Sequence, residues 1–460
     1  MKNLLELSRW EYRFLLLPEA VANFLDEVCE FMQQIRYEQP ITRTVYLNSD
    51  NYAVPWGYSL RLRKYLSHYS NPIQIDPGEA YRLEIKVAGD NHRREKTLLE
   101  LPLKEAIAYA QDFLGDHVCE PLRPYTVAEY QRLHFVPRHG EGLRLTVDRD
   151  TRYSFFSFAV SNDRSIPIGR EDFARVEIKL GEGGAETAAH AKLLSLLEKY
   201  RSLPVISKRE TANSLVGRYI DLFGDDFFKE LSRCEVESKF LLDHPNPAAL
   251  LIGLKKMLLK SGPYFLPQAY PYIQQAASIN HYWGRRDGGG KLCDGLKLQL
   301  YGKMLRPIFK RDTEVRLTAV GRIPVLVRRE VKEAPFVYTP EDYRQTLADA
   351  ANSLGELSPV GYVYRLRRAF WPENFHSKRI FHISIDEISS PTGKKMYQLE
   401  VEYTGRHHGG HLLQDPQAAQ DEIVNEVGEL SAIVLDFCNR DRECLKPTTL
   451  TKFDWLTQGG

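Results

Sequence analysis

Most of the chain alternates apolar and polar residues with a period of two, which is the pattern of half-buried β-strands. In the first half this pattern is clearest at 58–63, 81–86, 143–148 and 176–179, and in the second half at 314–318, 325–328, 364–367, 383–386 and 399–402. Fewer stretches have helical spacing, and they lie at 18–35, 102–114, 185–200, 247–260, 340–354 and 415–437. The pattern therefore predicts an α+β fold dominated by antiparallel sheet, with accessory helices.

This strand-rich pattern occurs twice. The segment EYRFLL at 11–16 returns as ESKFLL at 237–242, and each copy ends with a Ser-Lys or Thr-Lys step. We therefore expect a duplication, with a first domain at 1–213, a linking segment at 214–232 and a second domain at 233–460. A chain of 460 residues is long enough for two domains that each bury a core.

The polar face of the predicted strands is charged, because residues i and i+2 on the same side are both ionisable. Such pairs are Arg61 with Arg63, Glu84 with Lys86, Glu177 with Lys179, Glu235 with Glu237, Arg365 with Arg367, and Glu400 with Glu402. For any single strand, a charged face exposed to solvent on the outside of the protein explains the pattern. At least four such strands in each copy favour barrels whose charged faces turn inward and form a polar lumen, which requires a ligand.

The charges indicate which ligand such a lumen would take. Anionic oxygens would balance the positive charges of Arg61, Arg63, Lys86, Arg144 and Lys208. Phosphate is favoured among such anions because the planar guanidinium group of arginine matches its geometry. Acidic pairs facing the same lumen, such as Glu400 and Glu402, are useful if a divalent metal bridges carboxylate to phosphate. Metal-assisted phosphoryl transfer is the chemistry that this combination favours.

Composition excludes several other classes of protein. Lys and Arg total 62 against 61 for Asp and Glu, so the net charge of +1 gives no general attraction to nucleic acid or to an anionic membrane. No apolar run approaches the roughly 20 residues of a membrane span, and the N-terminus does not read as a signal sequence. The six cysteines form no C-x-x-C pair. We expect a cytoplasmic protein without a membrane segment.

Residues 235–239 (EVESK) begin an E-x-E-x-K pattern, and an Arg-rich series, Asp386, Glu400-x-Glu402 and Lys452 follow. In this order, over about 233–455, the second half resembles the CYTH-like, or triphosphate tunnel metalloenzyme, superfamily. Through segments at 9–13, 61–65, 84–86, 144–150, 177–179 and 207–208, the first half resembles the polyphosphate-polymerase branch, the VTC domain. The resemblance implies two eight-stranded closed barrels, or tunnels, that bind triphosphate with Mg or Mn.

The resemblance also implies roles for individual residues. In the first tunnel it assigns phosphate binding to Arg13, Arg61, Arg63, Lys86, Arg144 and Lys208, metal binding to Glu177, and secondary roles to Arg94 and Lys96. In the second it assigns phosphate to Lys239, Arg316, Arg328, Arg365, Arg367 and Lys452, and metal to Glu235, Glu237, Asp386, Glu400 and Glu402. The expected catalytic residues are Lys208, Glu177, Lys452 and Glu237. Arg13, where lysine is usual, and Thr318, where a second arginine is common, depart from the pattern.

Three functions remain open at this stage. The first is an enzyme that makes polyphosphate from nucleoside triphosphate in the first tunnel, hydrolyses triphosphate in the second, or does both. The second is a non-catalytic sensor of polyphosphate or nucleotide. The third is a nucleotide cyclase, which needs base recognition that the sequence does not show. The expected partners are triphosphate, ATP or polyphosphate, with no nucleic acid, and the choice between Mg and Mn is open.

Overall fold

The structure is a computed structural model of the chain. It describes residues 9–70, 73–76, 78–88, 93–140, 142–156, 165–181, 187–200, 202–219, 227–231, 233–260, 262–266, 272–286, 292–301, 304–318, 320, 323–337, 340–408, 416–440 and 442–458. The chain divides into two compact units, Met1–Tyr219 and Ile220–Gly460. The division falls inside the segment 214–232, where we expect the link. Residues 214–219 of that segment belong to helix α4 (Lys208–Tyr219).

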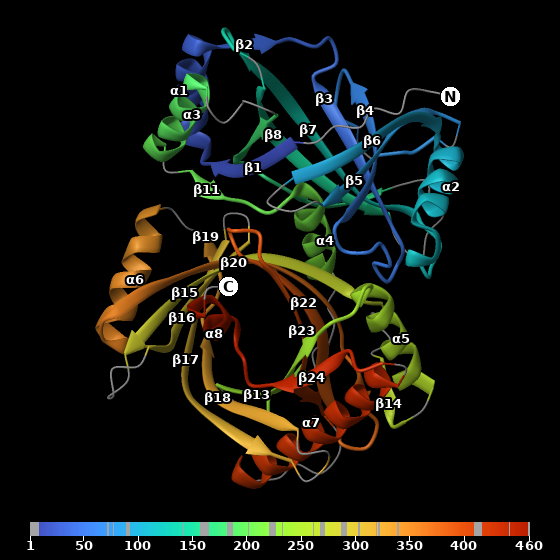
Figure 1. Ribbon diagram of the computed structural model, residues 1–460, viewed down its shortest axis with the longest axis vertical. Coiled ribbons are helices and arrows are strands. Elements are labelled where there is room, and N and C mark those ends of the chain that lie inside the picture. The colour runs from blue at the N-terminus through green and yellow to red at the C-terminus, as the bar shows by residue number, and fades with distance from the viewer. Residues whose placement is uncertain are drawn as a thin grey trace. The chain divides into compact units, whose positions relative to one another are not determined.

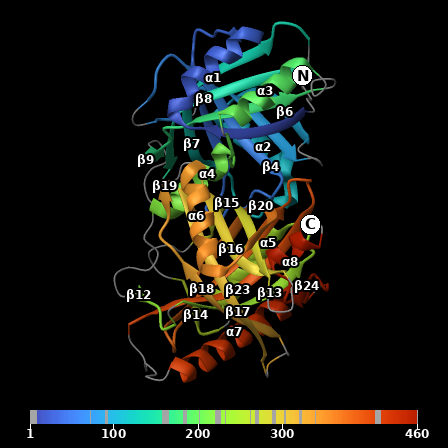
Figure 2. The same cartoon turned by 90° about the vertical axis from the view of Figure 1, so that its left-hand side faces the viewer.

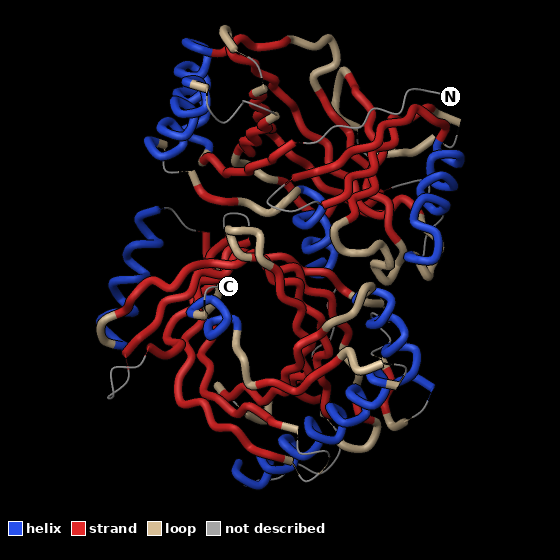
Figure 3. Tube along the Cα trace, in the orientation of Figure 1, coloured by secondary structure: helices blue, strands red, loops and turns tan. Residues whose placement is uncertain are grey.

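The first unit is built on one antiparallel sheet (Figures 1 and 3). Its strands are β1 (Arg9–Leu16), β2 (Met32–Ile35), β3 (Ile41–Asn48), β4 (Tyr58–Leu66), β5 (Ala80–Ala88), β6 (Arg93–Pro102), β7 (Arg123–Pro137), β8 (Leu143–Phe156), β9 (Ser165–Arg170), β10 (Ala174–Leu180) and β11 (Leu203–Pro204). They lie in the order β2-β7-β3-β4-β5-β6-β1-β10-β8-β9, with a further pairing of β7 with β8, and β11 pairs with β1. Among the described residues, the junction of β1 with β6 pairs Arg9 with Arg94 and Trp10 with Arg93.

Several helices pack around the sheet of the first unit. They are α1 (Pro18–Phe31), α2 (Leu103–Leu114), the short 3-10 helix η1 (Gly115–His117), α3 (Ala188–Lys199) and α4. In one buried cluster, which covers the apolar face of the sheet, Phe24 and Val28 of α1 and Leu193 of α3 pack with Val147 and Val176. Because side chains alternate along a strand, the residues between these apolar ones, such as Thr146 and Glu177, face the other side.

The second unit contains a closed barrel (Figure 1). Its strands are β12 (Phe227–Phe228), β13 (Cys234–Leu242), β14 (Tyr264–Phe265), β15 (Gln274–Arg286), β16 (Leu292–Tyr301), β17 (Met304–Leu317), β18 (Pro324–Lys332), β19 (Phe336–Val337), β20 (Leu357–Phe370), β21 (Glu373–Asn374), β22 (Arg379–Ser389), β23 (Lys395–His407) and β24 (Leu445–Thr448). The order β23-β13-β18-β17-β16-β15-β20-β22 closes on itself because β22 also pairs with β23. The predicted eight-stranded antiparallel barrel is therefore confirmed in the second unit, and a barrel in the first unit remains a prediction.

The helices of the second unit lie mainly outside the barrel. They are α5 (Pro247–Lys260), α6 (Pro340–Leu354), α7 (Pro416–Asn439) and α8 (Lys452–Thr457). The long helix α7 contacts β13, β18 and β23 along the barrel wall (Figures 1 and 2). Val427 and Leu430 of α7 and Val236 and Phe240 of β13 are buried, so the outer wall supplies the hydrophobic core. The alternate residues of β13, including Glu237, therefore turn into the lumen.

One predicted helix is shorter than its pattern. The stretch 18–35 has helical spacing, but α1 ends at Phe31, and residues 32–35 form β2, which pairs with β7. The pairing satisfies the backbone groups of this segment as well as a helix would, and Met32 is fully buried. Among the described helices, none is both long and apolar enough to cross a membrane.

Candidate functional site

The Ser-Lys and Thr-Lys steps at the end of each copy begin a helix in the same way. Ser207 and Glu210 exchange hydrogen bonds at the start of α4, with the Ser207 amide donating to the Glu210 carboxylate at 2.8 Å. Thr451 and Asp454 form the same capping box at the start of α8, where the Thr451 amide donates to Asp454 Oδ2 at 2.9 Å. The capping box fixes the first helical residue, which is a lysine in both copies.

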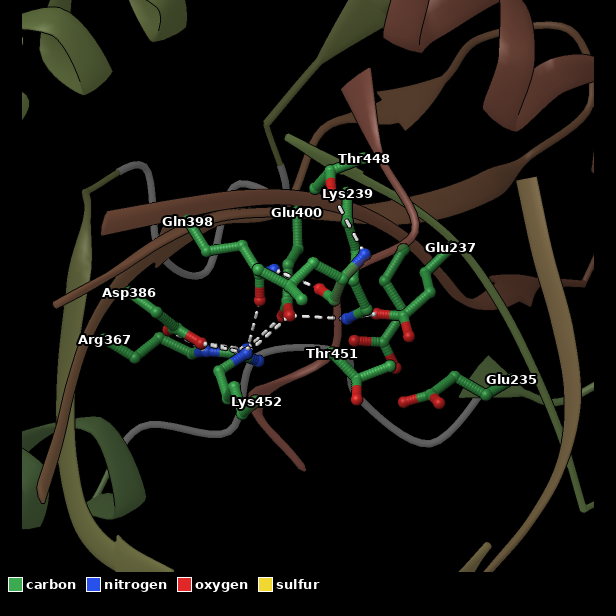
Figure 4. A network of polar contacts seen from close by, with 12 residues as sticks. Glu235, Glu237, Lys239, Arg367, Asp386, Gln398, Glu400, Thr448, Thr451 and Lys452 are labelled. Carbon is green, nitrogen blue, oxygen red and sulfur yellow. Dashed lines mark hydrogen bonds and ion pairs between the residues drawn. The ribbon is translucent and has the colours of Figure 1, made fainter. Parts of the chain in front are cut away.

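Lys452 enters the second lumen from this position (Figure 4). Its ammonium group lies 2.6 Å from Glu400 Oε1 and 3.0 Å from both Asp386 Oδ2 and Gln398 Oε1. Burial and these contacts act oppositely on the pKa of Lys452, and burial, which disfavours the charged form, lowers it overall. An anion that approached Lys452 would have to compete with its carboxylate partners.

Glu400 is the centre of the charge network in Figure 4. Lys239 of β13 lies 2.6 Å from its Oε1, and Arg367 of β20 also donates to it. Burial alone would raise the pKa of Glu400, but Lys239, Lys452 and Arg367 hold it well below the usual value. Arg367 also forms a bidentate pair with Asp386, at 2.6 and 2.7 Å. Strands β13, β20, β22 and β23 and helix α8 thus converge on one cluster.

A buried group of three carboxylates lies next to this cluster. Oxygens of Glu235, Glu237 and Glu402 all lie within 4.8 Å of one another, and in the part of the chain that the structure describes no other such group of possible metal ligands was found. Carboxylate oxygens are the ligands preferred by Mg and Mn, so the residues fit a divalent metal. Arg328 of β18 donates to both Glu235 and Glu237. This guanidinium neutralises the two carboxylates.

The three carboxylates differ in their ease of ionisation. For Glu237, burial and the neighbouring Glu235 raise the pKa. Burial would also raise the pKa of Glu235, but Arg328 and Lys310 hold this pKa well below the usual value. For Glu402, Lys332 and His382 outweigh burial and lower the pKa to about 2. Two of the three are therefore strongly anionic at neutral pH.

Two basic side chains in the same lumen make no direct ion pair among the described residues, although Glu330 lies near Lys297 and Asp386 near Arg365. Among the described residues, the side chains of Lys297 on β16 and Arg365 on β20 make no hydrogen bond or ion pair, and the Arg365 Nε is a buried donor without an acceptor. The register places Lys297 opposite Tyr282 and Arg365 opposite Ser278, on the inward face of the two strands beside β15. Burial lowers the pKa of both side chains. An isolated buried charge is costly, so these residues call for an anionic ligand.

The first unit repeats the pattern with fewer carboxylates. Asp148 of β8 accepts from Arg132 at 2.6 and 2.7 Å and from Lys208 of α4. Burial would raise the pKa of the Tyr130 phenol nearby, but Arg132, Arg63 and Lys208 lower it to about 8. A lowered phenol pKa is the sign of an excess of positive charge around this end of α4.

The other charged residues of the first unit form two further clusters. Glu84 pairs with Arg61 at 2.5 Å and with Arg63 at 2.9 Å. Glu11 pairs with Lys86 at 2.6 Å and with Arg13 at 2.8 Å. Glu177, the predicted metal ligand, is surrounded by cations: Lys179 at 3.0 Å, Arg13 at 3.5 Å and Arg132 at 3.9 Å. In the first unit, a metal at Glu177 would therefore have to compete with these basic side chains.

Most residues predicted from the resemblance lie in the charge clusters of the two units described above, and a few do not. Arg144 lies with its guanidinium 2.6 Å from His134 Nδ1. Arg316 lies on the outside of the second barrel, where it pairs with Glu314 at 2.8 Å and with Asp421 of α7 at 2.7 Å. The side chains of Arg94 and Lys96 lie outside the described residues.

A β-bulge explains the position of Arg316. The pairing of β17 with β18 shifts by one residue between Arg311 and Glu314, so Arg316 lies opposite Val325, on the outer face. Lys310, before the bulge, lies opposite Glu330 and contacts Glu235 at 3.1 Å in the lumen. The extra residue reverses the alternation of side chains along β17. A period of two counted from Lys310 therefore predicts the wrong face for Arg316.

Several lumen residues were not among the sequence predictions. They are Glu11, Arg132, Asp148, Lys297, Lys310, Glu330, Lys332 and His382. Period two gives a signal for some of them, since Arg132 and His134 share a strand face, as do Asp148 and Arg144. Lys310 has no such signal because of the bulge.

Comparison with known proteins gives no family. No family model and no curated protein matches the sequence. Among solved structures, the chain is similar to a chain in the structure of the Schizosaccharomyces pombe Mediator head module, with 8% sequence identity and a TM-score of 0.23 over 42% of this chain and 93% of that chain. At this TM-score the likeness carries no argument about fold or function.

Proposed function

We propose that the second barrel binds an oligophosphate chain together with Mg or Mn and hydrolyses its terminal phosphoanhydride bond. The observation that carries this proposal is the placement of Lys297 and Arg365, which make no direct ion pair among the described residues, in the lumen that also holds the carboxylates of Glu235, Glu237 and Glu402. Cations without partners favour an anionic ligand, and a carboxylate group of this kind favours a divalent metal. A metal-bound oligophosphate satisfies both.

The internal ion pairs are expected to exchange partners when this ligand binds. Lys239, Arg328, Arg367 and Lys452 now neutralise carboxylates, and each has the donor chemistry to hold phosphate oxygens instead. When bound at Glu235, Glu237 and Glu402, the metal would neutralise phosphate charge and polarise the scissile bond. The exchange keeps every buried charge compensated in both states.

In the proposed reaction water attacks the terminal phosphorus of triphosphate. A new P–O bond forms to the water oxygen, the bond to the bridging oxygen breaks, and pyrophosphate leaves with the electron pair. The water proton passes to bulk solvent or to a carboxylate of the lumen, and orthophosphate is the second product. The basic side chains stabilise the charge on the non-bridging oxygens, which is the main catalytic contribution in phosphoryl transfer.

For the first unit we propose a second closed tunnel that binds polyphosphate and extends it from nucleoside triphosphate. The additional pairing of β7 with β8 supports closure. Basic residues outnumber the carboxylates around Glu11, Glu84, Asp148 and Glu177, which favours a highly charged anion over a metal. Polymerisation needs no activated water, so it suits a lumen poor in carboxylates. A sensor that binds polyphosphate without turnover is the competing function for this unit.

A cytoplasmic location is part of the proposal. The six cysteines, all among the described residues, form no disulfide, and Cys29 and Cys119 are exposed. Exposed reduced thiols suit a reducing compartment.

Phosphorus NMR of the full chain with ATP or triphosphate and Mg or Mn tests both assignments. We expect Lys452→Ala to reduce orthophosphate release by about a hundredfold or more, because Lys452 contacts the central carboxylates of the lumen. Lys208→Ala is expected to remove long-chain phosphate signals and to spare hydrolysis. Lys446→Ala, an exposed lysine of the same unit as Lys452, serves as the matched control.

Each outcome of this experiment has a definite reading. Hydrolysis that survives Lys452→Ala would contradict the assignment to the second barrel. If no variant and no metal gives turnover while calorimetry still detects polyphosphate binding, the protein is a sensor and the enzymatic proposal is wrong.

A further inference from the structure

A cavity lies at the outside of the second barrel, and Arg328 of the lumen network also contributes to its lining. It has a volume of about 370 Å³ and is lined by Arg233, Cys234, Glu314, Val327, Arg328, Arg329 and Gln420. These residues come from the start of β13, from β17 and β18, and from the N-terminal half of α7. Because Cys234 lies opposite Arg329 in the β13–β18 register, both belong to the outer face of the wall.

Two arginines of this cavity lack partners. Among the described residues, the exposed guanidinium groups of Arg233 and Arg329 make no hydrogen bond or ion pair. The one carboxylate in the lining, Glu314, is already held by Arg316 at 2.8 Å. Arg329 also lies directly opposite Arg311 on β17, and like charges in opposing positions of a sheet repel. The outer wall therefore has an uncompensated positive charge at this place.

The backbone at the cavity adds a second observation. Arg233 has a φ of 59°, which a residue with a side chain rarely adopts, and its carbonyl accepts a hydrogen bond from the Glu330 amide at 2.9 Å. Such conformations cost free energy and are retained where the surrounding structure uses them. Here the conformation places Arg233 at the start of β13, on the cavity that also contains Arg329.

We propose that this cavity is a binding site for the phosphate group of a small phosphate monoester. The forked guanidinium groups of Arg233 and Arg329 match a tetrahedral oxyanion, and the Gln420 amide offers a further donor. The volume is in the range of small-molecule sites and larger than a bare phosphate needs, so the ligand carries an organic group as well. This site is separate from the proposed triphosphatase and does not depend on it.

Cys234 provides a local reporter for the test. Its thiol is half-buried in the cavity, and burial raises its pKa, so alkylation is slow enough to follow. The alkylation rate of Cys234 is measured by peptide mass spectrometry while inorganic phosphate or glycerol 2-phosphate is titrated at constant ionic strength. We expect both anions to protect Cys234 with a saturating dependence, and the monoester to act at the lower concentration.

Variants separate this site from the lumen. Arg329→Gln, alone and combined with Arg233→Gln, is expected to weaken protection about tenfold or more through loss of charge-assisted hydrogen bonds. Arg440→Gln, which changes an exposed arginine elsewhere in the unit, is the matched control. Lys452→Ala is expected to leave protection unchanged, so a failed triphosphatase proposal and a failed cavity proposal give different results.

Two results would overturn the proposal. One is that neither anion changes the alkylation rate of Cys234 in the wild-type chain. The other is equal protection in the wild type and in both arginine variants. Protection by inorganic phosphate alone would overturn the monoester assignment and leave a site for free phosphate.

Discussion

The two units carry the same signature at corresponding places, but they balance charge differently. In the first unit each inward carboxylate is held by two or more basic side chains, and these carboxylates are Glu11, Glu84, Asp148 and Glu177. In the second unit the carboxylates are more numerous, and they include Glu235, Glu237, Glu330, Asp386, Glu400 and Glu402. A duplicated basic framework can therefore serve an anion alone or an anion with a metal, and the carboxylates decide which.

The largest effect that this comparison predicts is on stability. Asp148→Asn would leave Lys208 without its buried counter-charge and Arg132 with only the more distant Glu177, at 3.9 Å, so we expect the free energy of unfolding of the first unit to fall by about 3–5 kcal/mol. Asp386→Asn is expected to cost clearly less, because Arg367 and Lys452 both keep their contacts with Glu400. Hydrogen exchange followed by mass spectrometry assigns the loss to one unit.

The same hydrogen-exchange experiment can be repeated with added polyphosphate. If the first lumen binds polyphosphate, added polyphosphate should restore part of the protection lost in Asp148→Asn, since its oxygens replace the missing charge. Equal destabilisation by the two substitutions would show that the carboxylates are not more important in the first unit, and the comparison would fail.

The next largest predicted effect is on the pH dependence of stability. Burial and the neighbouring Arg144 and Arg132 lower the pKa of His134 to about 3, and Arg144 donates to its Nδ1. Between this pKa and the unfolded value near 6.5 the unfolded chain binds a proton that the folded chain does not, so stability falls as pH falls through this window. We expect His134→Gln to remove about 1–2 kcal/mol of the stability lost by the first unit between pH 7 and pH 5.

The second unit provides the contrast. His382 lies 3.5 Å from Glu402, so a carboxylate offsets part of the burial that lowers its pKa. His382→Gln should therefore change the pH dependence of the second unit less than His134→Gln changes that of the first. A similar slope in His134→Gln and the wild type, measured by urea unfolding at each pH, would contradict the positive excess in the first lumen.

The sequence predicts the strands well and the faces of the strands less well. Alternation identifies Lys239, Arg367 and Glu400 as inward residues because β13, β20 and β23 have no bulge near them. It gives no warning of the bulge between Arg311 and Glu314, because an extra residue depends on how two strands pair and not on the composition of one. Alternation also does not show which charged side chains pair with one another. The partners of Asp148, for example, come from two other elements, β7 and α4.

The smallest predicted effect tests this reading of the bulge. Arg316→Ala removes only ion pairs on the outer surface, with Glu314 and Asp421, so we expect less than about 1 kcal/mol of lost stability and unchanged triphosphate turnover. Lys310→Ala, the matched variant on the same strand, removes a lumen cation that contacts Glu235 and Glu330, and it should lower turnover about tenfold or more. A folded Arg316→Ala protein with impaired turnover would place Arg316 at the substrate, and the face assigned to β17 beyond the bulge would be wrong.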